Sequence, residues 1–114
     1  MGTPVRRLDP GLTLHNGNWV ATLAAAGTTQ GDAAAVTAYH CYVTTVAAGS
    51  GVVLLQRAPG SEYSLCNAGA NALLVYPWSG ASLNGVTANL PISIPVNGAA
   101  WFKVISSTKL ICVS

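Results

Sequence analysis

Residues 92–105 read ISIPVNGAAWFKVI, and this stretch decides the fold class. Apolar and polar residues alternate on both sides of the Asn97-Gly98 pair, a strong signal for a tight turn between two antiparallel strands. Pro91 and Pro95 fall on one side of the first strand, so we expect that strand at the edge of a sheet. The stretch therefore predicts a β-hairpin with one exposed edge.

Short strands are also predicted over most of the remaining chain. A smaller hairpin is expected around Asn16-Gly17, and Asn84-Gly85 predicts another tight turn. Strands that recur every ~8–12 residues with turn residues between them are typical of a sandwich or barrel. We therefore expect an all-β fold, a compact β-sandwich or small barrel of short antiparallel strands. The further predicted strands are Tyr39–Val46, Val52–Leu55, Glu62–Cys66, Ala72–Tyr76 and Lys109–Val113.

Two segments depart from this pattern. Thr29 and Asp32 precede a run of alanines with the spacing of a helix cap, which predicts one short helix near residues 29–36. Residues 1–11 show no apolar periodicity and predict an extended N-terminal arm. The expected organisation is an arm over residues 1–11 and a single β domain over residues 12–114.

The composition excludes several functional classes. Only 7% of the residues are charged, against about 25% in an ordinary soluble domain, while 51% are hydrophobic. No uninterrupted apolar stretch reaches the ~18–20 residues of a membrane-spanning helix, so we expect no membrane partner. Five scattered cations make no basic stripe, so we expect no nucleic-acid partner. Three acidic residues are too few for most hydrolytic chemistry, and we expect no enzymatic activity and no cofactor.

No side-chain cluster with catalytic or metal-binding spacing is found. His40 and Cys41 are neighbours on a predicted strand, so their side chains point to opposite faces. The two histidines and three cysteines lack the spacing of zinc ligands, and Gly49-Ser50-Gly51 is interpreted as a turn. Cys41, Cys66 and Cys112 stand in apolar contexts, which predicts unpaired cysteines and assembly in a reducing cytoplasm.

The aromatic residues allow two interpretations. Three tryptophans and four tyrosines could form a carbohydrate-binding platform, or they could lie in the core and in subunit interfaces. Few charged or amide groups stand beside them, which favours the interface. Trp78 follows Pro77 and precedes Ser79-Gly80, so we expect it in an exposed turn where it contacts a partner.

Residues 66–80 read CNAGANALLVYPWSG, and this segment resembles a run found in small virion proteins of tailed bacteriophages. The similarity continues through Asn84-Gly85, Ile92–Val96 and Trp101-Phe102, and spans residues 27–114. Proteins of that kind are capsid decoration (cement) proteins or modules of fibres and tail tips. The resemblance implies a β-rich, catalytically inert and trimeric protein.

From the resemblance we expect a virion protein that is assembled in the host cytoplasm. It would bind the phage major capsid protein on the outer head surface as a homotrimer and stabilise the shell. The absence of a sequence repeat or coiled coil favours the head. The alternative is a receptor- or carbohydrate-binding module of a tail fibre or tip.

Specific residues are expected to carry these contacts. The subunit interface and core would include Leu74, Tyr76, Trp101 and Phe102. The arm would bind the capsid, with its arginines paired to carboxylates on the shell. The arm residues expected to make this contact are Thr3, Val5, Arg6, Arg7 and Leu8.

Overall fold

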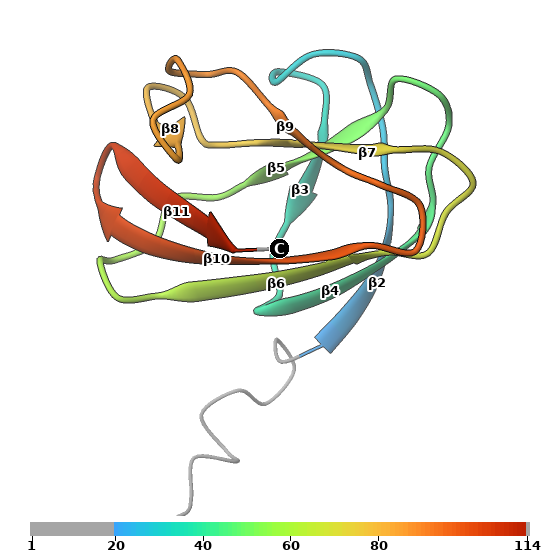
Figure 1. Ribbon diagram of the computed structural model, residues 1–114, viewed down its shortest axis with the longest axis horizontal. Helices are drawn as coiled ribbons and strands as arrows, with labels where there is room; N and C mark the ends of the chain where they lie inside the picture. The colour runs from blue at the N-terminus through green and yellow to red at the C-terminus, as the bar shows by residue number, and fades with distance from the viewer. Residues whose placement is uncertain (1–19, 114) are drawn as a thin grey trace, which may run out of the picture.

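The computed structural model describes residues 20–113, which form ten strands and no helix (Figure 1). The strands are β2 (Val20–Ala24), β3 (Ala34–Val36), β4 (His40–Thr45), β5 (Gly51–Leu54), β6 (Glu62–Asn67), β7 (Leu73–Tyr76), β8 (Ser82–Leu83), β9 (Ile92–Ile94), β10 (Ala99–Ser106) and β11 (Lys109–Val113). The all-β prediction is confirmed for this part of the chain. The predicted arm and most of the predicted hairpin around Asn16-Gly17 lie outside the described residues.

These strands form a β-solenoid of about four turns. In each of the first three turns, the chain makes one strand of a six-stranded sheet and then crosses to a four-stranded sheet. As a result β2, β4 and β6 stack in parallel in one sheet, while β3, β5 and β7 stack in parallel in the other. The orders are β2-β4-β6-β10-β11-β8 and β3-β5-β7-β9.

The last turn runs in the opposite direction and closes one end of the stack. Strand β9 pairs antiparallel with β7, and β10 pairs antiparallel with β6. Strand β11 then folds back on β10, and the short β8 pairs with β11 at the sheet edge. At the other end, β2 and β3 each have one strand neighbour among the described residues.

The prediction of an antiparallel sandwich or barrel is wrong, because five of the eight strand pairings are parallel. The segment between β4 and β5 shows the reason. Gly49 has a φ of 78°, and Ser50 donates its main-chain N–H to Ala47 at 3.0 Å, as in a hairpin turn. The chain leaves this turn for the other sheet, and β5 pairs with β3 and β7. Strand spacing and turn residues are the same in both arrangements, so they did not distinguish them.

The Asn97-Gly98 turn is likewise a corner, because β9 and β10 lie in different sheets. Asn97 has a φ of 64°, and its main-chain N–H bonds the Asn67 carbonyl at 2.9 Å. The hairpin predicted for residues 92–105 is therefore wrong. The edge position of its first strand is confirmed, since β9 ends the four-stranded sheet. A tight turn at Asn84-Gly85 is also confirmed, with φ values of 49° and 77°.

The helix predicted near residues 29–36 is absent, although its cap is partly formed. The Asp32 carboxylate accepts hydrogen bonds from the Thr29 N–H at 2.8 Å and from the Thr28 N–H at 3.0 Å. The residues that follow pair with β5 as strand β3, and Val36 is fully buried. A helix of two turns is marginal alone, whereas this strand gains both sheet hydrogen bonds and core packing.

The core lies between the two sheets and includes Phe102, Tyr63 and Leu65 of the six-stranded sheet. Leu54, Leu73 and other aliphatic side chains of the four-stranded sheet face them. Phe102 and Tyr63 are among the largest side chains with no exposed surface. The solenoid therefore has an apolar core between the two sheets.

Asn67 ties together the corner that follows β6. Its side-chain amide is fully buried and donates to the carbonyls of Asn71 at 2.9 Å and Ile94 at 3.0 Å. Asn71 in turn donates to the Val46 carbonyl of the preceding turn at 2.8 Å. A Cβ on Gly69 would lie 2.7 Å from the Val46 nitrogen, so glycine is required there for close approach of two solenoid turns. Gly69 is not among the described positive-φ residues, so close packing, and not a left-handed backbone, requires the glycine there.

Candidate interaction face on the six-stranded sheet

The side of the six-stranded sheet that points away from the core forms one continuous surface. Along β10, buried and accessible residues alternate, with Phe102 and Val104 inward and Trp101 and Ile105 outward. The same alternation occurs in the other long strands of this sheet. We call the outward side chains of β2, β4, β6, β10 and β11 the outer face.

The strand register aligns the outer face into rows. One row crosses all five strands through Val20, His40, Ser64, Trp101 and Val113. Side chains in such a row stand about 5 Å from their neighbours on adjacent strands, so they form a contiguous surface. Because the strands on either side of β6 carry larger side chains, Ser64 lies at a low point of the row.

A second row lies beside the first along the strands. It runs through Thr22, Tyr42, Cys66 and Ala99. In both rows, therefore, a small side chain on β6 lies next to a large side chain on β4.

The outer face holds most of the exposed large hydrophobic side chains of the described residues. Six of the nine lie on it, and Trp101 (41%) and Tyr42 (49%) are the two aromatic residues among them. The four aliphatic members are Val20, Ile105, Ile111 and Val113. Contiguous exposed apolar surface on a soluble protein marks an interaction site more often than scattered exposed residues do.

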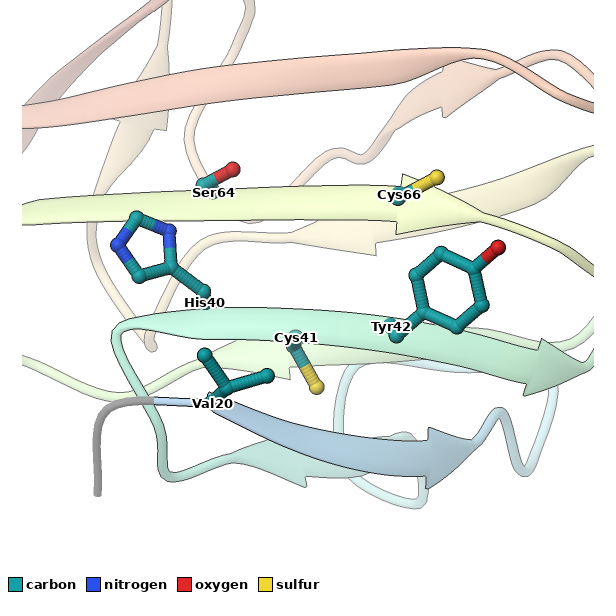
Figure 2. A pocket seen from close by; sticks show the side chains of 6 residues that line it. All are labelled: Val20, His40, Cys41, Tyr42, Ser64 and Cys66. Carbon is teal, nitrogen blue, oxygen red and sulfur yellow. The ribbon is translucent and has the colours of Figure 1, made fainter. Parts of the chain in front are cut away.

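A shallow hollow of about 160 Å³ lies over β4 and β6 on this face (Figure 2). Its lining consists of Val20, His40, Cys41, Tyr42, Ser64 and Cys66. In Figure 2 the His40 ring and the Tyr42 ring stand on the same side of β4, between that strand and the neighbouring strand that carries Ser64 and Cys66. The hollow is open to solvent and mainly apolar, and its lining includes a hydroxyl, a phenol and an imidazole.

Charged groups are sparse on the outer face. Glu62 and Lys103 are register partners on adjacent strands, and Lys109 lies near the end of β11. The adjacent acid and base leave this part of the face nearly neutral. A strongly acidic or basic partner therefore has no complementary patch here.

The cysteines show no arrangement for thiol catalysis within the described residues. Cys41 is buried in the core on the opposite side of β4 from His40, as the strand alternation predicted. Burial raises the pKa of the Cys41 thiol and of the Cys112 thiol, which keeps both protonated at neutral pH. All three cysteines are free. Across residues 20–113, no three His, Cys, Asp or Glu side chains gather closely enough to hold a metal ion.

Arg57 has a structural environment rather than a ligand-binding one. Its guanidinium lies between two aromatic rings, with its central carbon 4.3 Å from the Tyr39 centroid and 4.2 Å from the Tyr63 centroid. Nη2 donates to the Thr37 carbonyl at 2.9 Å. The arginine therefore clamps the chain between β3 and β4 against β6.

The structure separates the four residues expected in the interface and core. Phe102 is fully buried in the core, and Trp101 lies on the outer face. Tyr76 is 6% exposed and donates its hydroxyl to the Thr28 carbonyl at 3.2 Å, while Leu74 is half-buried on β7. Only Trp101 of this group is available for a partner on the outer face.

Trp78 is 7% exposed, so the expectation that it protrudes from a turn is wrong. Its indole Nε1 donates to the Ser107 carbonyl in the loop between β10 and β11 at 2.8 Å. The proline and glycine beside it do form a turn, but this turn folds against the closed end of the solenoid. The expected capsid contacts Thr3, Val5, Arg6, Arg7 and Leu8 lie outside the described residues.

Several outer-face residues were missed by the sequence analysis, including Ile105, Ile111 and Val113. Each occupies a strand position that alternates with a core residue, so alternation alone marked them as outward. What the sequence did not provide was the parallel register that places them on one surface. Long-range strand pairing sets that register.

Comparisons with protein-family models, with curated proteins and with solved structures find no match for this chain. Among the described residues, no helix has the length and apolar character needed to span a membrane.

Proposed function

We propose that this chain is a structural protein of a phage virion, a decoration protein that binds the outer surface of the head as a homotrimer. The observation that carries the proposal is the outer face, an exposed apolar surface on a two-sheet scaffold. Such a surface favours contact with another protein. In this account the protein stabilises the shell by adding many modest contacts between subunits of the major capsid protein.

The location of the resembling motif supports a structural role. Asn67 and Asn71 donate side-chain hydrogen bonds to the main-chain carbonyls of Ile94 and Val46 in neighbouring turns, and Gly69 packs closely against Val46. The motif therefore specifies a scaffold. Specific binding would be supplied by the outward residues of the strands.

In the proposed attachment, the N-terminal arm contributes a second contact. Arg6 and Arg7 would pair with carboxylates of the capsid protein, and the extended chain would add to an exposed sheet edge. Residues 1–11 carry three of the eight charged residues of the chain, so the arm would add a polar contact to the apolar contact of the outer face.

The test uses heads that lack this protein and purified protein added from outside. The proposal predicts saturable binding and a higher temperature for release of the packaged DNA. Deleting residues 2–11 should weaken binding while leaving the unfolding temperature of the free protein unchanged. Heads that bind no protein, or that bind it without any change in DNA release, would contradict the proposal.

The alternative function, a receptor- or carbohydrate-binding module of a tail fibre or tip, gains support from two observations. The parallel turns form a structural repeat that no sequence repeat indicated, and stacked turns are suited to elongated particles. Tyr42 and Trp101 also stand exposed on either side of β6, where aromatic rings could stack on a sugar. The number of copies per particle separates the two functions.

A further inference from the structure

The outer face carries both a protruding side chain and a depression. Trp101 on β10 is 41% exposed, and the hollow lies over the adjacent strands β6 and β4. Trp101 is the register partner of Ser64 but is not among the residues that line the hollow. A large apolar side chain thus stands beside an unfilled apolar depression on the same surface.

We propose that Trp101 of one copy of this chain inserts into the hollow of a second copy, between Val20, His40, Tyr42 and Cys66. This inference rests on the proposed function, because it supplies the subunit contact of the homotrimer. A surface that holds both the protruding residue and its receiving site is complementary to itself, so a copy of the same chain is the occupant that fits.

The surroundings of the hollow support that choice. Val113 and Ile111 extend the apolar surface on the Trp101 side, and Val20 and Tyr42 extend it on the other side. When Trp101 enters the neighbouring hollow, these two apolar regions meet. Residues that dominate binding are enriched in tryptophan, tyrosine and arginine, and they cluster in desolvated pockets near the centre of an interface.

The charges on the face permit the same pairing. Glu62 and Lys103 lie side by side, so one copy can present its acid to the base of the next without leaving a net charge in the interface. When Trp101 of one copy enters the hollow of a second copy, the two copies can exchange the contact reciprocally as a dimer, or successive copies can form a closed ring. In the proposed trimer, three copies form such a ring.

The test measures assembly of the full chain and of three variants by sedimentation over a concentration series. Trp101→Ala removes the inserted side chain, and Ser64→Glu places a charge on the floor of the hollow. Each should weaken self-association by at least about 30-fold. Leu90→Ala is the matched control, because Leu90 is 49% exposed but lies in a loop away from the outer face. Its assembly should be unchanged.

A second readout follows Cys66, which lines the hollow. Alkylation by iodoacetamide, resolved by residue with mass spectrometry, should be slow in the assembled protein and faster in Trp101→Ala. Cys112 packs against the core and does not line the hollow, so it serves as the internal reference for an intact fold. Equal Cys66 rates in both proteins would contradict insertion.

The remaining outcomes separate this contact from the proposed function. Multimers that survive both Trp101→Ala and Ser64→Glu would overturn the contact, and so would a wild-type chain that stays monomeric. A monomer whose tryptophan emission shifts with maltohexaose or chitohexaose would assign the hollow to a glycan. A multimer that depends on Trp101 but does not bind heads would support the contact and contradict the decoration function.

Discussion

Asn67 donates a buried side-chain hydrogen bond to the main-chain carbonyl of Ile94 at 3.0 Å. This bond joins the third parallel turn of the solenoid to the antiparallel turn that closes it. The same amide also bonds the Asn71 carbonyl, and its oxygen accepts the Gly69 N–H at 3.0 Å. One side chain therefore holds the corner where the chain direction reverses.

We expect Asn67→Ala to lower the free energy of unfolding by about 2–4 kcal/mol, because buried main-chain groups lose their partners. Asn71→Ala is the control, for which we expect a smaller effect. Asn71 is exposed and donates one hydrogen bond to the Val46 carbonyl, so losing this bond should lower the free energy of unfolding by about 1 kcal/mol. Urea denaturation of both variants measures the difference. Equal losses would contradict the central role of Asn67.

Gly69→Ala should destabilise the protein by about 1–3 kcal/mol, because the added methyl would overlap the backbone and side chain of Val46. Gly31 provides the control. The nearest atom to a Cβ there is the Thr29 hydroxyl at 4.0 Å, so Gly31→Ala should change stability by less than about 0.5 kcal/mol. Thermal unfolding followed by circular dichroism tests the pair. A neutral Gly69→Ala would show that the two turns are not in close contact.

The outcome for this corner shows how far the sequence could predict the fold. Alternation in residues 99–105 correctly located a strand. The structure then separates two residues that were predicted together, with Phe102 inward and Trp101 outward, because side chains alternate along a strand. Asn97 and Gly98 correctly located a turn. Whether that turn joins paired strands or passes to another sheet depends on contacts with Asn67, thirty residues away in the chain. Local patterns contain no information on such contacts.

Only part of the candidate site could be predicted from the sequence. Trp101 was predicted as an interface residue from its aromatic character. The hollow beside it could not be predicted, because it forms only through the parallel register of β4 and β6. The turn at Trp78 was recognised correctly from its neighbouring residues. Trp78 was nevertheless predicted to be exposed, because the sequence does not show that this turn packs against Ser107. Alanine-rich residues 33–35 have high helix propensity, and pairing with β5 overrides it.

The stability of the protein should fall as the pH rises above about 9. Burial raises the pKa of Cys41 and of Cys112 above the ordinary value of 9.0. The pKa of Tyr63 is raised above 10.0, and burial is the largest cause of that shift. Above the ordinary values the folded state binds more protons than the unfolded state, so these groups favour unfolding as the pH increases. Below those values, their contribution is constant.

Urea midpoints measured from pH 7 to pH 11 test this dependence. The double variant Cys41→Ala with Cys112→Ala should show a smaller decline between pH 9 and pH 10 than the wild-type chain. A wild-type midpoint that rises with pH over this interval would contradict the assignment.

Arg57→Ala should lower the free energy of unfolding by about 2 kcal/mol, since it removes stacking on two rings and the bond to Thr37. Nη1 is buried without a hydrogen-bond partner among the described groups, so stacking carries much of the interaction. Arg57→Lys keeps the charge but loses the planar stack, and should recover less than half of the loss. Lys109→Ala, at an exposed position, is the control and should have little effect. Full recovery by lysine would show that charge alone matters.

The central claim, that this chain coats the head of a phage, is tested most directly by its copy number in purified particles. Quantitative mass spectrometry, with the major capsid protein as the internal standard, gives that number. The account predicts hundreds of copies, in fixed proportion to the capsid protein and in multiples of three. A handful of copies per particle would contradict it and assign the chain to the tail.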